Sequence, residues 1–304
     1  MKIPRLILTL IFLLSCFNIL SYAQDEPAEE EWDPVSAGTL ITWTAPVCAK
    51  GELVVQPFFY YTRTRGSFDA EGKYQSLPAG DKKYQYQEQL FMQYGITDRL
   101  EIDAEAFYQQ NYIRQDGASA HSSGLADSYL YLRYCAIEEK KWIPHLTGIL
   151  QLKMPTGKYQ KLNPDKLGTD SMGTGSWDPG FGFNLSKKFK PFIIHADAIF
   201  AFPQQVKVDG VKTRYASYIN YDLGLEYFLP KGFNLMLEAN GYVQADSRQD
   251  GSRTPSTSSS YLTISPGIGW SCQAVQFLLA YQRVVCGVNV DATDSVVLTA
   301  IYTF

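Results

Sequence analysis

Residues 100–109 read Leu-Glu-Ile-Asp-Ala-Glu-Ala-Phe-Tyr-Gln, and apolar and polar side chains alternate along most of this stretch. Successive side chains of a β-strand point to opposite faces, so the stretch predicts a strand with one apolar and one carboxylate-rich face. Unpaired carboxylates in a dry soluble core would be costly. A strand between lipid and a wet interior accommodates both faces. The stretches around Leu223 and Leu237 repeat the pattern.

The same period-two pattern recurs after residue 51 and predicts about twelve strands. The predicted strands cover residues 52–63, 84–96, 99–113, 125–137, 143–155, 173–186, 191–203, 217–229, 232–246, 260–272, 275–286 and 294–304.

The connections between these strands alternate in length. The long ones are rich in Gly, Ser, Asp, Lys and Pro and cover residues 64–83, 114–124, 156–172, 204–216, 247–259 and 287–293. The short ones are Thr97-Asp98, Glu138–Trp142, Lys187–Lys190, Pro230-Lys231 and Gln273-Ala274. Long extracellular loops, short periplasmic turns and an even strand number are typical of outer-membrane barrels. We therefore predict an all-β fold, a transmembrane antiparallel up-and-down β-barrel over residues 52–304.

The last predicted strand ends the chain on an aromatic residue. Its apolar positions run Val296, Leu298, Ala300, Tyr302 and Phe304. This pattern resembles the C-terminal signal that the barrel-assembly machinery reads in outer-membrane proteins. We therefore expect that machinery and outer-membrane lipid as partners, with Tyr302 and Phe304 as the assembly signal.

The N-terminus predicts secretion. Lys2 and Arg5 precede a short apolar stretch, residues 6–14, and Ser21-Tyr22-Ala23 offers a small-x-small cleavage site. Residues 1–23 therefore read as a signal peptide, and the expected location is the outer membrane of a Gram-negative cell. The alternative is a lipoprotein cleavage box that would leave Cys16 acylated. Residues 24–51 are interpreted as a periplasmic N-terminal extension or a plug inside the barrel.

Composition excludes several classes of protein. A formal net charge of −4 argues against nucleic acid as a partner. Tyrosine occurs 21 times, which fits the aromatic girdles of a membrane barrel. Cysteines 48, 135, 272 and 286 lack the spacing of a zinc site, so we expect no metal and no cofactor. Their pairing as disulfides or presence as isolated thiols stays open.

The alternation also predicts which charged side chains line the lumen. The predicted lumen residues are Glu101, Asp103, Glu105, Asp127, Arg133, Lys153, Asp178, His195, Asp197, Asp222, Glu226 and Glu238. Because acids outnumber bases severalfold, a conducting pore is expected to prefer cations or neutral solutes, with the run from Glu101 to Glu105 contributing most. The alternative is that the carboxylates pair locally or bond to a plug.

Catalytic patterns were weighed against this interpretation. His121-x-Ser123 has the spacing of a nucleophile and base on one strand face, but it falls in a predicted loop. His195 and Asp197 share a strand face that carries no serine, and His145 lies near a predicted rim. We therefore expect no enzymatic activity.

Three segments resemble one known family of outer-membrane barrels. They are Gly124–Tyr134 (GLADSYLYLRY), Leu152–Tyr159 (LKMPTGKY) and Gly173–Phe183 (GTGSWDPGFGF). They are similar to the Gly-x-Gly-Asp, Pro-Thr-Gly and Gly-Thr-Gly motifs of the family described as Putative MetA-pathway of phenol degradation. Ala126 departs from the pattern, where the second glycine is usual.

The resemblance implies an outer-membrane channel or transporter for passive passage of small, hydrophobic or aromatic solutes. The second hypothesis is a surface-exposed structural or binding barrel that acts through its long loops. The third, a lipid-modifying enzyme of the outer membrane, has no clear support in the sequence.

Overall fold

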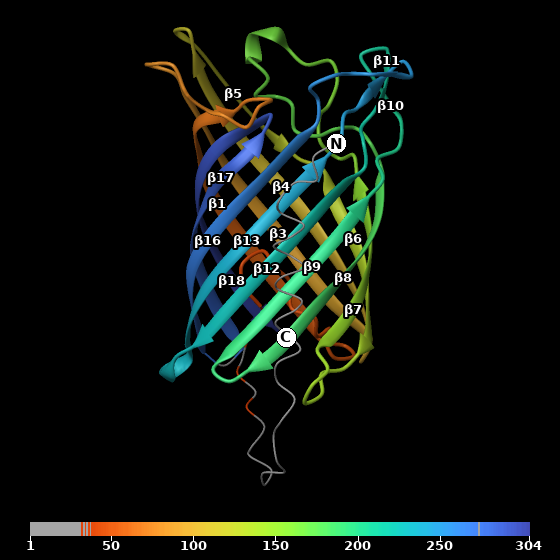
Figure 1. Cartoon of the computed structure of the whole chain (residues 1–304), viewed down its shortest axis with the longest axis vertical. Helices are drawn as coiled ribbons and strands as arrows, with labels where there is room; N and C mark the ends of the chain where they lie inside the picture. The colour runs from red at the N-terminus through yellow and green to blue at the C-terminus, as the bar shows by residue number, and fades with distance from the viewer. Residues whose placement is uncertain (1–31, 33, 35, 37, 273) are drawn as a thin grey trace. The chain divides into compact units, whose positions relative to one another are not determined.

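Twelve of the strands that the structure describes pair in sequence order into one closed antiparallel sheet (Figure 1). The computed structural model describes residues 32, 34, 36, 38–272 and 274–304. Among these residues the order around the sheet is β1-β3-β4-β6-β7-β8-β9-β12-β13-β16-β17-β18, and β18 pairs back onto β1. The prediction of a twelve-stranded barrel is thus confirmed. The predicted signal peptide and Cys16 lie outside the described residues.

The barrel strands are β1 (Leu53–Phe68), β3 (Lys82–Thr97), β4 (Leu100–Gln115), β6 (Ser128–Ile137), β7 (His145–Met154), β8 (Asp178–Phe189), β9 (Phe192–Ala201), β12 (Tyr218–Phe228), β13 (Phe233–Gln244), β16 (Ser259–Cys272), β17 (Val275–Val288) and β18 (Val290–Thr303). The connections contain the short strands β2 (Tyr74–Ser76), β5 (Ala118–Leu125), β10 (Val206–Val208), β11 (Val211–Arg214), β14 (Arg248–Gln249) and β15 (Ser252–Arg253), and the 3-10 helices η2 (Pro164–Lys166) and η3 (Pro230–Gly232).

The two faces of the sheet differ as the alternation requires. On the outer face Leu237 and Leu298 are each 50% exposed, although they are large and apolar. On the inner face Glu101, Arg133 and Glu238 are at most 1% exposed. This inside-out distribution suits a barrel whose outer face meets lipid and whose backbone groups are all paired between strands. No helix among the described residues has the length and apolar character needed to cross a membrane.

The two ends of the barrel differ in their connections (Figure 1). We call the end with short turns the turn end and the opposite end the loop end. One predicted loop is wrong: residues 287–293 form a tight turn, because β17 continues to Val288 and β18 begins at Val290. Asn289 between them has φ 51°, a left-handed conformation that asparagine tolerates.

Three other predicted loops fold into hairpins at Asp-Gly pairs. In Asp116-Gly117, Asp209-Gly210 and Asp250-Gly251 both residues have positive φ, as a type I′ turn requires. The first of these turns joins β4 to β5, so His121 and Ser123 lie on a strand and not in a loop. The other two turns belong to the sheet β10-β11-β14-β15 at the loop end.

The sixth barrel strand begins later than predicted, at Asp178 and not at Gly173. Gly175 has φ 78°, which interrupts an extended strand. The Thr174 N–H donates to Asp127 (2.9 Å), which lies between β5 and β6, and not to a neighbouring strand. Residues 173–177 therefore belong to the loop that precedes β8.

Candidate functional site: the barrel interior

Eleven of the twelve charged residues predicted for the lumen lie on the inner face of the strands, and Asp127 lies between β5 and β6. Ten of the twelve are buried, and only Glu105 and Asp222 are half-buried. Asp127, Lys153 and Asp178 are covered by the loop that precedes β8, through Gly157, Thr174 and Ser176. Most of the others are buried because part of the chain before β1 occupies the interior. We call residues 36 and 38–50 the N-terminal segment; Figure 1 draws it in red among the strands.

The backbone N–H groups of the N-terminal segment bond to inward side chains. Glu238 accepts from three consecutive residues, Leu40, Ile41 (3.0 Å) and Thr42 (3.2 Å). The other N–H contacts run from Trp43 to Asp197 (3.1 Å), from Ala45 to Ser186 (2.8 Å) and from Cys48 to Glu101. A buried N–H group left without a partner costs about 1–3 kcal/mol, so these acceptors hold the segment in place.

The carbonyl groups of the segment are held from the other side. The Thr44 carbonyl accepts from Arg133 (2.5 Å) and Asn184 (2.7 Å), and the Ala45 carbonyl accepts from Thr147 (2.6 Å). These donors lie on β6, β8 and β7, so one short stretch of backbone ties several strands together. The sequence did not indicate Asn184 or Thr147, because nothing local marks them as partners of residues 44 and 45.

Two buried ion pairs neutralise part of the interior. Arg133 pairs with Glu101 (2.5 Å), and Asp103 lies 3.9 Å away. Lys153 pairs with Asp178 (2.5 Å) and Asp127 (3.5 Å). Both predicted inward bases, Arg133 and Lys153, are therefore paired with nearby carboxylates, as the alternative of local pairing expects. The half-buried carboxylates of Glu105 and Asp222 lie outside these two pairs.

Ser186, His195 and Glu226 form a hydrogen-bonded chain that strand periodicity did not reveal. Ser186 lies on β8 directly opposite His195, 2.7 Å from its Nδ1, and Nε2 lies 2.9 Å from Glu226. The arrangement resembles a nucleophile, base and acid. However, Ser186 is 4% exposed and accepts the Ala45 N–H, so the N-terminal segment covers the hydroxyl. The chain of residues anchors that segment in this structure.

The other histidines do not extend this chain of contacts. His145 lies at the turn end with Nε2 3.1 Å from Cys135 Sγ. His121 and Ser123 are exposed on β5. Cys48, Cys135, Cys272 and Cys286 are all free thiols. Within the described ranges, no cluster of His, Cys, Asp and Glu could hold a metal ion.

The interior is filled near the turn end. Toward the loop end it is accessible along β3, β4, β12, β13 and β16, but not beside β7 and β8, where Lys153 and Asp178 are at most 5% exposed. Inward residues around the N-terminal segment, such as Thr147, Asn184 and Glu226, have 0% exposure. Trp43 adds to the filling, with its ring edge-on to Tyr131 at 4.7 Å. Inward residues farther along the strands, such as Gln87, Gln109, Asn220, Tyr242 and Tyr261, are half-buried. The accessible part of the interior therefore begins beyond the N-terminal segment.

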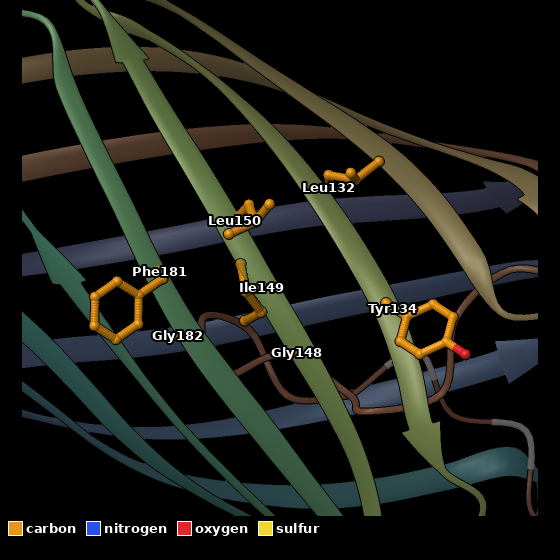
Figure 2. Close-up of a pocket in the computed structure, with 7 residues that line it drawn as sticks. All are labelled: Leu132, Tyr134, Gly148, Ile149, Leu150, Phe181 and Gly182. Carbon is orange, nitrogen blue, oxygen red and sulfur yellow. The ribbon is translucent and has the colours of Figure 1, made fainter.

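A separate groove of about 330 Å³ lies on the outer face of the barrel. Figure 2 shows Gly148 between Leu132 and Tyr134 on one side and Phe181 on the other. Gly148 has no side chain to fill the space between these outward side chains. The groove is part of the apolar face expected to meet lipid.

Comparison with known proteins identifies the family. The family described as Putative MetA-pathway of phenol degradation matches residues 67–293. The chain belongs to this family. The resemblance carried by the three sequence motifs is therefore confirmed. No curated protein matches the sequence.

Solved structures show the same fold. An outer membrane channel from Pseudomonas putida F1 is similar with a TM-score of 0.70 at 15% identity, over 90% of this chain and 100% of that chain. The translocator domain of the autotransporter NalP from Neisseria meningitidis gives a TM-score of 0.45 at 11% identity, over 84% and 90% of the two chains. At 15% identity, the likeness to the Pseudomonas putida channel shows the barrel fold alone.

The three family motifs meet around one carboxylate at the loop end. Asp127, from the first motif, accepts from the N–H groups of Gly157 (3.1 Å) and Thr174 (2.9 Å), which belong to the second and third motifs. The loop between them is pinned by Lys158, which donates to Asp170 (2.5 Å) and lowers the pKa of that carboxyl. The motifs therefore fix the loop 155–177 against the barrel wall.

Proposed function

We propose that this chain is an outer-membrane channel for the passive passage of small solutes, closed toward the periplasm by its N-terminal segment. The turn end would face the periplasm and the loop end the exterior, as in other barrels of this type. The proposal rests on the hydrogen bonds from backbone N–H groups of residues 40–48 to Glu238, Asp197 and Glu101. A barrel of twelve strands is intermediate between filled eight-stranded and open sixteen-stranded ones, so such a segment can control its conduction.

The test is single-channel recording of the purified, refolded chain in a planar bilayer. The expected result is a small conductance, because the N-terminal segment fills the interior near the turn end. A large, permanently open pore in the unaltered chain would contradict the proposed closure.

The proposed channel should prefer cations over anions, more strongly at low salt. Arg133 and Lys153 are paired, whereas Glu105 and Asp222 are half-buried in the accessible part. Unscreened carboxylates concentrate cations and exclude anions. We expect the double change Glu105→Gln and Asp222→Asn to bring the reversal potential in a salt gradient toward zero. Of the run Glu101 to Glu105, this proposal keeps only Glu105, since Glu101 and Asp103 are at most 1% exposed.

Glu88→Gln is the matched control, because Glu88 is exposed on the outer face of β3. It should leave the reversal potential unchanged. An anion-selective unaltered channel, or a reversal potential indifferent to the double change, would refute this assignment.

The proposal includes export by the N-terminal signal and assembly into the outer membrane through Phe304. Phe304 is 69% exposed, and its N–H donates to the Leu53 carbonyl (2.9 Å), where the last strand meets the first. We expect deletion of Phe304 to lower the amount of assembled barrel, read as heat-modifiable migration in unheated detergent gels. Phe304→Tyr keeps an aromatic end and should assemble normally. Full assembly of the truncated chain would rule out Phe304 as the signal.

Binding at the cell surface through the loops is the second candidate function. The sheet β10-β11-β14-β15 borders a groove of about 440 Å³ whose lining includes Tyr215, Gln244 and Thr257. This groove offers both an aromatic ring and polar groups to a ligand. Absence of conductance from both the unaltered chain and a variant lacking the N-terminal segment would favour this function over a channel.

A further inference from the structure

One wall of the accessible interior is built from side-chain amides. On β3 and β4, Gln85 donates to Asn111 (2.7 Å). Two residues farther toward the turn end, Gln109 donates to Gln87 (2.9 Å). A primary amide has two N–H donors and an oxygen with two lone pairs. The Asn111 amide also donates to the Thr169 carbonyl (2.9 Å) and to Met172 Sδ (3.4 Å), so the unused donors and acceptors are mainly those of Gln85, Gln87 and Gln109. All four residues are half-buried, and so a solute in the interior can reach these groups.

The facing wall is built from tyrosines. Tyr242 lies 5.4 Å from both Tyr218 and Tyr261, and its ring is within 14° of parallel to that of Tyr261. Rings stacked in this way cover one another's faces, so their edges and hydroxyl groups are what the interior meets. β12, β13 and β16 carry these tyrosines. Four barrel strands separate them from the amide wall on one side and three on the other, which places the walls opposite each other.

Two carboxylates on the strands of these walls, Glu105 on β4 and Asp222 on β12, disfavour the binding of anions. Glu105 accepts from the Tyr131 hydroxyl (2.9 Å) and Gln89 (3.1 Å), and Asp222 accepts from Asn240 (2.8 Å). None of these donors is a base, so no positive charge neutralises either carboxylate. Asp222 also lies opposite Asp197 on β9, a second acidic residue. An apolar solute would instead leave the amide and hydroxyl groups without hydrogen-bond partners, which is unfavourable.

We propose that the space between the two walls binds small neutral polyhydroxylated solutes, namely mono- and disaccharides. Each sugar hydroxyl both donates and accepts, as the amides and tyrosine hydroxyls do. The inference deepens the proposed function by naming a solute class for the channel. It differs from the hydrophobic or aromatic solutes that the family's description implies.

Calorimetric titration of the full, refolded chain in an amine-oxide detergent tests the proposal without requiring conduction. Maltose is the probe, and maltoside detergents are excluded because they carry the same sugar. We expect measurable millimolar binding, and roughly tenfold weaker binding after the double change Gln87→Leu and Gln109→Leu, since each amide contributes a hydrogen bond. Gln110→Leu, one position along β4 on the outer face, should leave the affinity unchanged.

Phenol and tetramethylammonium chloride provide the competing arms. Binding of either in preference to maltose, absence of maltose binding, or an equal affinity in the double variant would overturn the proposal. If the double variant fails to fold, Tyr242→Phe removes one hydroxyl and keeps the ring, and it should weaken maltose binding several-fold. Conductance without sugar binding would refute this inference alone, whereas sugar binding without conductance would refute only the channel.

Discussion

Leu223→Arg should destabilise the inserted barrel by about 2–4 kcal/mol, the cost of a basic residue facing the middle of the bilayer. Leu223 lies at the centre of β12 on the outer face and is 44% exposed. The measurement is the free energy of unfolding from lipid vesicles in a denaturant titration. The expected effect depends only on which face meets lipid, so it tests the membrane assignment directly.

The matched control is Asn220→Arg on the same strand. Asn220 points into the accessible interior and is half-buried. An arginine there can remain hydrated, so the expected loss of stability is small. Equal losses from the two variants would mean that both faces of β12 have the same surroundings, contrary to the barrel described above.

Release of the N-terminal segment should raise the single-channel conductance several-fold. Deleting residues 39–48 removes the backbone held by Glu238 and Asp197. The double change Glu238→Ala and Asp197→Ala should act in the same direction with the segment still present, because its N–H groups lose charge-assisted hydrogen bonds. Both variants are to be recorded in the same bilayer and salt as the unaltered chain.

Glu105→Ala serves as the control for this effect. Its carboxylate bonds to Gln89 and Tyr131 and to no residue of the N-terminal segment. It should alter ion preference and leave the closed state intact. A deletion variant with unaltered conductance would show that the interior is blocked elsewhere and would refute the role proposed for the segment.

Much of the barrel could be predicted from local patterns. The alternation around residues 100–109 follows from strand geometry alone, and it placed Glu101, Asp103 and Glu105 on the inner face, as observed. The Asp-Gly pairs at 116–117, 209–210 and 250–251 favour tight hairpin turns. Asp and Gly are also common in loops, so the composition of these segments predicted loops. Asn289 gave no comparable signal, and the tight turn there depends on the pairing of β17 with β18.

By itself, the sequence determined the strand number, the direction of each face and the family, because these depend on periodicity and on motifs of neighbouring residues. Only the tertiary structure decided the partners of the interior side chains. Ser186 meets His195, and Glu238 meets residues 40–42, through strand register and through a segment nearly 200 positions away. Such contacts leave no local pattern. An inward carboxylate has the same place in the alternation whether its hydrogen-bond partner is water or a buried backbone N–H group.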